Sequence, residues 1–153
     1  MPDQPNAARG FTLIELIVAV VIAAVLAAIA VPSYVSYARK SHRTEAKTAL
    51  LDIAALEERY YSVNNTYSGT ATDVGYAAWP AVIGSGYYQI NAPVITAAVP
   101  PAAGLPAGTP ATYTFTAQAI GDQANDTQCL TFIINSQGIQ DATPAGNAFT
   151  CWH

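Results

Sequence analysis

The sequence predicts an α+β protein in which a long N-terminal α-helix packs on an antiparallel sheet of three or four strands. An apolar run from Phe11 to Val31 comes first, and residues 32–63 then carry apolar side chains at helical spacing. Short β-branched and aromatic runs follow, separated by glycine and proline. The chain has 153 residues, of which 10% are charged. This length fits one ordinary domain together with an anchor.

The apolar run is long enough to cross a membrane. Between Phe11 and Val31 the only polar residues are Thr12 and Glu15. At 1.5 Å per residue the run spans about 32 Å, the thickness of a hydrocarbon core. No other run in the sequence approaches this length. We therefore predict one membrane-spanning segment.

A second helical stretch follows Pro32, which ends or kinks the first because it lacks a backbone donor. If the helix persists through Pro32, residues 11–63 form a rod of about 80 Å. Its first half is apolar all round and suits a membrane or a filament core. Its second half carries one apolar stripe and is expected to pack under a sheet. The stripe consists of Ala46, Ala49, Leu50, Ile53, Leu56, Tyr60 and Val63.

The remainder of the chain is expected to be a connector followed by strands. Residues 64–86 are rich in Gly, Thr and Asn, which is typical of irregular structure. The loop "PPAAGLPAGTP" cannot lie in a sheet interior, and Gly138 marks a turn. Strands are predicted at residues 87–91, 94–99, 112–119 and 129–135.

The apolar run allows two interpretations. It can be a removable secretory signal, with Arg9 as its charged flank and Ala28-Ile29-Ala30 as a cleavage site. Alternatively the helix is kept and only residues 1–10 are removed. Glu15 interrupts the apolar region, and the run is longer than a typical signal, which favours the second interpretation.

The stretch "RGFTLIELIVAVVIAAVLAAIAVPSY" resembles the processing motif of type IV prepilins. The resemblance implies that a prepilin peptidase cuts between Gly10 and Phe11 and methylates the new amine of Phe11. It implies a pilin fold with a leader at residues 1–10, a transmembrane and filament-core helix at 11–31, and an amphipathic continuation at 32–63. Residues 64–153 would hold the αβ-loop, the sheet and a disulfide-bounded C-terminal region. The glycine frequent in the middle of the family's apolar run is missing here, where Ala24 stands nearby.

The resemblance also gives Glu15 a role. In a filament the apolar helix is surrounded by the same helix of its neighbours, and a carboxylate in that dry core needs a cation. The amine of Phe11 on an adjacent subunit can supply it, but only after the leader is removed. The alternative is a carboxylate near the membrane surface that reaches lipid headgroups.

The two cysteines, Cys129 and Cys151, bear on topology. The basic residues that follow the helix would place the C-terminal part in the cytoplasm under the positive-inside rule. A cysteine pair without other thiols is better suited to an oxidising compartment, so we expect a periplasmic C-terminus. We expect a structural disulfide of about 3 kcal/mol, with a metal or redox pair as the alternative. Pilins similarly carry an exposed disulfide-bounded segment near the C-terminus.

The charges restrict the partners. All six basic residues precede Tyr60, and the only charged side chains after it are four aspartates. Direct nucleic-acid binding is not expected, since it requires Lys or Arg against phosphate. The helix cations are expected on a solvated or inter-subunit face. They are Arg39, Lys40, Arg43, Lys47 and Arg59.

We find no pattern for a catalytic site, a cofactor or a metal. His42 and His153 are isolated, the four aspartates are scattered, and Glu57 and Glu58 point to different sides of a helix. The chain is therefore not expected to be an enzyme.

The resemblance implies a structural subunit of a type IV pilus, serving adhesion, twitching motility or DNA uptake. The segments "ERYYSVNNTYSG" and "CW" favour a minor, PilE-type pilin over a major one. Expected partners are other pilin subunits, the prepilin peptidase and the assembly platform. The chain would cross the bacterial inner membrane once before assembly and lie in the extracellular pilus afterwards. The alternatives are a pseudopilin of a type II secretion system and a membrane-anchored periplasmic binding module that does not polymerise.

Overall fold

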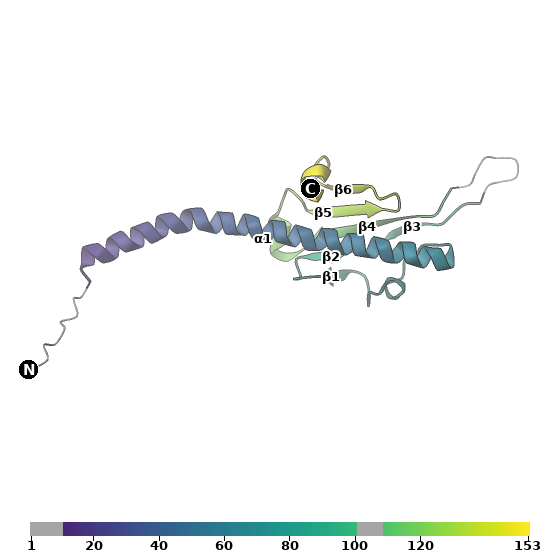
Figure 1. The fold of residues 1–153 in the computed structure, drawn as a ribbon, viewed down its shortest axis with the longest axis horizontal. Coiled ribbons are helices and arrows are strands. Elements are labelled where there is room, and N and C mark those ends of the chain that lie inside the picture. Colours follow the sequence, from purple (N-terminus) through teal and green to yellow (C-terminus); the bar gives the residue numbers. More distant parts are fainter. Residues whose placement is uncertain (1–10, 101–108) are drawn as a thin grey trace, which may run out of the picture. The chain divides into compact units, whose positions relative to one another are not determined.

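The computed structural model describes residues 11–100 and 109–153 (Figure 1). The chain divides into two compact units, residues 1–38 and residues 39–153. In the described part of the first unit the only regular element is the beginning of helix α1, Leu13–Asn64. The loop "PPAAGLPAGTP" lies largely outside the described residues.

Helix α1 has nearly the length predicted from the sequence, and it continues through Pro32. A proline removes one intrahelical hydrogen bond, and the helix on both sides retains the others. The alternative that Pro32 ends the helix is therefore wrong. A bend at Pro32 stays a prediction.

The part of α1 that belongs to the second unit buries one stripe. Its buried residues follow steps of three and four, as a helix packed on one side requires. The stripe shares Ala46, Leu50 and Ile53 with the prediction, whereas Val63 is 77% exposed. Its two ends are charged residues, which an apolar pattern does not reveal. The buried positions are Arg43, Ala46, Leu50, Ile53 and Glu57.

The second unit contains an antiparallel sheet with six strands in the described residues. The order is β1-β2-β4-β5-β6, and β3 pairs with β4 on the same side as β2. The strands are β1 Ala81–Ile83, β2 Tyr88–Ile90, β3 Val94–Thr96, β4 Thr112–Ala119, β5 Thr131–Asn135 and β6 Gln140–Thr143. Three short helices complete the unit: η1 Ala71–Val74, η2 Gly121–Asn125 and α2 Ala148–Trp152.

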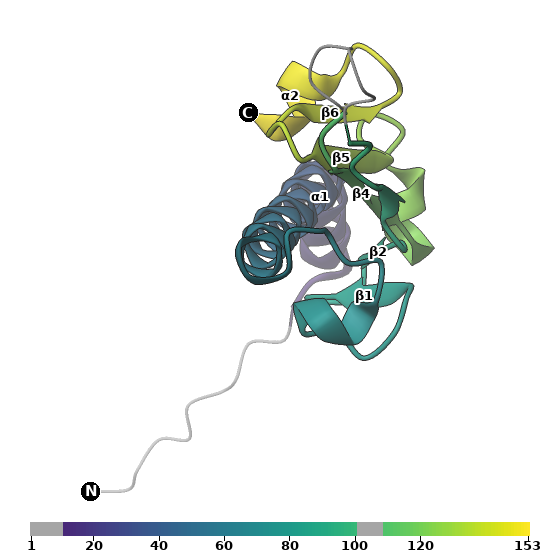
Figure 2. The same ribbon diagram turned by 90° about the vertical axis from the view of Figure 1, so that its right-hand side faces the viewer.

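The core lies between α1 and one face of this sheet, which curves around the helix (Figure 2). Alternate residues of β4 are buried, and Phe115 and Ala117 stand opposite Ile134 and Phe132 of β5. These side chains join Leu50 and the other buried residues of α1 in one cluster. This arrangement confirms the α+β class and the helix-on-sheet fold.

The structure differs from the sequence-based prediction in its short helices and strands. Strand β1 and helix η1 lie within residues 64–86, which were expected to be irregular, and β6 and α2 lie within the C-terminal segment. A strand of three residues shows too little alternation to stand out from its neighbours. The fold therefore contains the predicted strands together with edge elements that pattern alone does not reveal.

Candidate functional site

The apolar half of α1 is uncovered. No residue between Phe11 and Tyr37 is buried, and 0% of the most apolar 18-residue window, of mean hydropathy 3.0, is buried inside the molecule. By length and composition this helix could cross a membrane. Exposing so much apolar side chain to water is unfavourable. Such a surface is a site for lipid or for other apolar helices.

Glu15 makes local hydrogen bonds at the start of this helix. Its Oε2 accepts from the backbone N–H and the hydroxyl of Thr12, both at 3.4 Å, while the N–H of Glu15 donates to Thr12 Oγ1 at 3.3 Å. This is the reciprocal pattern of a capping box, in which a threonine and a glutamate three residues later satisfy each other's backbone donors. The spacing T-x-x-E was visible in the sequence, but sequence reasoning missed it.

The Glu15 carboxylate has no cationic partner within the described chain. The bonds from Thr12 are long for hydrogen bonds, so they hold the carboxylate weakly. In the described residues the one ion pair joins Arg43 to Asp126, far along the sequence from Glu15. Phe11, two residues before the first residue of α1, is 87% exposed, and Gly10 lies outside the described residues. The carboxylate thus remains available to a cation from another molecule.

Arg43 corrects the expectation that all the helix cations lie on a solvated or inter-subunit face. Its guanidinium donates two hydrogen bonds of 2.6 Å to the carboxylate of Asp126, and both residues are buried. The carboxylate raises the pKa of Arg43 further above its already high value. A guanidinium–carboxylate pair with two hydrogen bonds fixes the relative orientation of the two side chains as well as pairing their charges. It ties α1 to the turn after η2.

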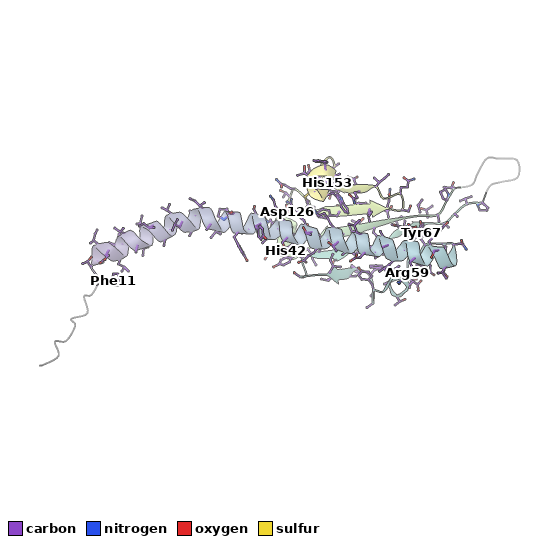
Figure 3. The ribbon with its side chains drawn as sticks, in the orientation of Figure 1. Phe11, His42, Arg59, Tyr67, Asp126 and His153 are labelled. Carbon is purple, nitrogen blue, oxygen red and sulfur yellow. A yellow bond between two sulfur atoms is a disulfide. The ribbon has the colours of Figure 1, made fainter. Side chains whose placement is uncertain are left out.

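Gln123 extends this buried pair into a network. Its amide nitrogen donates to Asp126 at 3.0 Å and to the Tyr88 hydroxyl at 3.3 Å, and its oxygen lies 3.0 Å from Nδ1 of His42. The ring of His42 also stacks on Tyr87 at 3.7 Å. His42 therefore packs within the fold, and Figure 3 shows it and Asp126 near the same stretch of α1. The network is structural, because its polar groups satisfy one another.

Glu57 is the other charged residue on the buried stripe. It is fully buried, Oε2 accepts from the Ser68 N–H at 3.0 Å, and Oε1 has no partner. Burial raises the pKa of this carboxyl, although the Ser68 N–H lowers it in part. Glu58, its neighbour, is exposed, which agrees with the prediction that Glu57 and Glu58 point to different sides of a helix. Glu57 is therefore a buried acid whose pKa lies above its ordinary value.

Cys129 and Cys151 form a disulfide with an S–S distance of 2.06 Å. The bridge joins Cys129, two residues before the start of β5, to helix α2, and both cysteines are buried. Between them, residues 137–139 and 144–146 are exposed. The expected disulfide is thus confirmed. In the part of the chain that the structure describes, no group of three or more His, Cys, Asp or Glu side chains could hold a metal ion.

Two family models match the chain. The prokaryotic N-terminal methylation motif matches residues 5–31. The family described as type IV minor pilin ComP, DNA uptake sequence receptor, matches residues 32–133. The second match covers more than half of the chain and includes most of the sheet.

Several curated proteins are similar over part of their length. The type IV major pilin protein PilA of Myxococcus xanthus is 38% identical over 69 residues, covering 45% of this chain and 31% of that protein. A fimbrial protein of Pseudomonas aeruginosa is 38% identical over 93 residues, covering 56% and 60%. Fimbrial protein Q of Moraxella bovis is 36% identical over 77 residues, covering 46% and 48%. In each case the match spans less than two thirds of the relative.

Proposed function

This chain belongs to the type IV minor pilin ComP family, and we propose on that premise that it is built into a pilus filament as a minor subunit. The family is one of structural proteins, not enzymes. Its partners in the filament would be other pilin subunits, which surround its apolar helix. The uncovered helix from Leu13 to Val31 is the observation that carries this proposal.

The N-terminal methylation motif supports a specific maturation step. A prepilin peptidase would cut between Gly10 and Phe11, and the new amine of Phe11 would be methylated. Before cleavage the nitrogen of Phe11 is an amide and carries no charge. Afterwards it is a cation, so only a processed subunit could provide a partner for the carboxylate of a neighbouring Glu15.

Assembly would then depend on one pair of charges between subunits. Buried among apolar helices, Glu15 would exchange its two weak bonds from Thr12 for a bond from the methylated amine of an adjacent Phe11. A buried carboxylate without such a partner is strongly unfavourable. Before assembly the subunit would span the inner membrane once, with residues 39–153 in the periplasm, and the assembly platform would extract it from there.

Intact mass and location test this proposal. We expect the chain in the sheared filament fraction, beginning at Phe11 and carrying one methyl group. The matched control is Gly10→Val, which blocks the bond to be cut and should leave the full-length chain in the membrane. A mature chain that begins at Val31, or a processed chain absent from filaments, would contradict the proposal.

The family description names a DNA uptake sequence receptor, which favours DNA binding as a second candidate function. Sequence-independent DNA affinity comes from Lys and Arg against phosphates, and this chain has neither after Arg59. Arg43 is already matched by Asp126. We therefore propose that the sheet face of this member does not contact DNA phosphates, and that any contact uses the remaining cations of α1.

The salt dependence of binding tests this point. If the mature chain binds duplex DNA, Arg59→Gln should lower the slope of log affinity against log salt by about one. Asp73→Asn on η1 is the control and should leave that slope unchanged. A steep slope that does not change when the cations of α1 are removed would show that the sheet face binds DNA after all.

A further inference from the structure

A cleft beside α1 gathers positive charge in a chain that is otherwise acidic. The formal net charge is −4, and the cleft has a volume of about 390 Å³. One wall is the face of α1 that carries Lys40, Thr44 and Lys47, which are four and three residues apart and so lie on one side of the helix. The opposite wall holds Thr150, which lies in α2, and His153, which follows α2.

Lys40 and Lys47, two cations of this cleft, form no ion pair with an acidic side chain among the described residues. None of the described residues that line it has an acidic side chain. Arg43 also reaches the cleft, but Asp126 matches its charge. Lys47 Nζ donates to the Trp152 carbonyl at 3.3 Å and keeps two further donors, and Lys40 is exposed.

We propose that this cleft binds a single phosphate-type oxyanion. The Thr44 hydroxyl donates to the Lys40 carbonyl at 3.2 Å. The two ammonium groups of α1 and the Thr150 hydroxyl on the opposite wall still offer more donors than the two oxygens of a carboxylate can accept. A phosphate presents three or more oxygens and is bound well by lysine as a point charge. The same chemistry is offered by free phosphate and by the headgroup of an anionic lipid.

The shape of the cleft and its surroundings argue against a nucleic acid as the occupant. A duplex presents a row of phosphates, whereas the cleft is one local hollow lined by α1, α2, Gln128 and His153. Beyond Tyr60 the charged side chains of the unit are all aspartates, which repel a polyanion. A single anionic group avoids this repulsion.

The test is a titration of the mature full-length chain with inorganic phosphate in maltoside micelles, which contain no phosphate. At matched ionic strength, amide resonances of Thr44, Thr150 and His153 should shift with phosphate and saturate, and chloride should not reproduce the shifts. Lys40→Gln and Lys47→Gln should each weaken binding by roughly fivefold or more. Arg59→Gln is the matched control, because Arg59 lies on the same helix outside the cleft, and binding should not change.

Lys40→Gln is the decisive variant, since Lys47 also contacts the Trp152 carbonyl and its loss could disturb the fold. Unsaturable shifts, or equal affinity in wild type and Lys40→Gln, would overturn the proposal.

Two further experiments identify whether the bound oxyanion is free phosphate, a lipid headgroup or part of a nucleic acid. In nanodiscs of anionic lipid, occupancy by headgroups would move the same resonances before phosphate is added, whereas a site for free phosphate would respond only to the titration. Duplex DNA that displaces phosphate with a salt slope of several charges would show a polymer-binding surface, and would overturn the single-anion proposal.

Discussion

Helix α1 carries two glutamates in opposite settings. Glu15 is exposed, in a run of apolar residues that are themselves exposed. Within the described residues its carboxylate accepts only two weak hydrogen bonds, both from Thr12. Glu57 is fully buried against its own sheet and has one backbone partner and one unsatisfied oxygen. The Glu15 carboxylate has no cationic partner among the described residues, and another molecule can supply one. The Glu57 carboxylate is enclosed by its own fold.

The difference extends to the whole of each region. Residues 13–31 contain apolar side chains that none of the described residues covers, whereas Leu50 and Ile53 are 0% exposed beneath the sheet. A stripe at helical spacing indicates packing within one molecule, and an all-round apolar helix indicates packing against others or in lipid. The three predictions that follow probe the folded unit, from the largest effect to the smallest, and each should leave residues 13–31 unaffected.

Asp126→Ala should cause the largest loss of stability. It leaves the Arg43 guanidinium buried without its carboxylate, which costs about 3–5 kcal/mol in the free energy of unfolding. Urea unfolding of the mature chain in micelles, followed by tryptophan fluorescence, measures it. Asp122→Ala, an exposed neighbour in η2, is the control and should lie within about 0.5 kcal/mol of wild type. A loss below that of the control would show that the pair contributes little.

Removing the disulfide should have the next largest effect. Cys129→Ser combined with Cys151→Ser frees a loop with a sequence separation of 22. The free energy of unfolding should fall by about 3 kcal/mol, because the unfolded chain regains entropy. The same urea assay applies, and wild type with its disulfide reduced is the matched comparison. Equal unfolding midpoints for oxidised and reduced wild type would contradict this prediction.

Glu57 should produce a smaller, pH-dependent effect. Burial raises its pKa above the ordinary value of 4.5, so the folded state binds the proton more tightly than the unfolded state does. Stability should therefore fall as pH rises from about 4.5 to the raised pKa, and stay lowered above it. Glu57→Gln should remove this component, whereas Asp52→Asn, an exposed control, should not. An unchanged pH profile in Glu57→Gln would show that the carboxyl titrates normally.

The features that were predicted correctly are those whose hydrophobic pattern continues over many residues. The helix extends over many turns, and β4 alternates over eight residues, so both have a clear period. The Arg43–Asp126 pair joins residues 83 positions apart, and no local pattern indicates which of the helix cations finds which aspartate. Glu57 was likewise recognised only as an acid on one side of a helix, because burial depends on the segment around Ser68 that folds over it.

The N-terminal site shows the opposite case. The roles of Gly10, Phe11 and Glu15 came from a resemblance in sequence, and they remain predictions because they concern contacts between molecules. The capping bonds of Thr12 and Glu15 are the part that one chain can show. They give the carboxylate a local function that the sequence also encodes, in the spacing T-x-x-E.

The most direct test makes the same substitution at both glutamates. Glu15→Gln keeps the size of the side chain and removes its charge, so it should be processed to Phe11 and remain in the membrane, with filament incorporation strongly reduced. The loss would correspond to about 3–5 kcal/mol if the amine of Phe11 is fully buried in the filament. The urea midpoint of residues 39–153 should not change. Glu57→Gln should show the reverse, with an altered pH profile of unfolding and normal incorporation. Normal incorporation of Glu15→Gln, with processing verified by mass, would contradict the account.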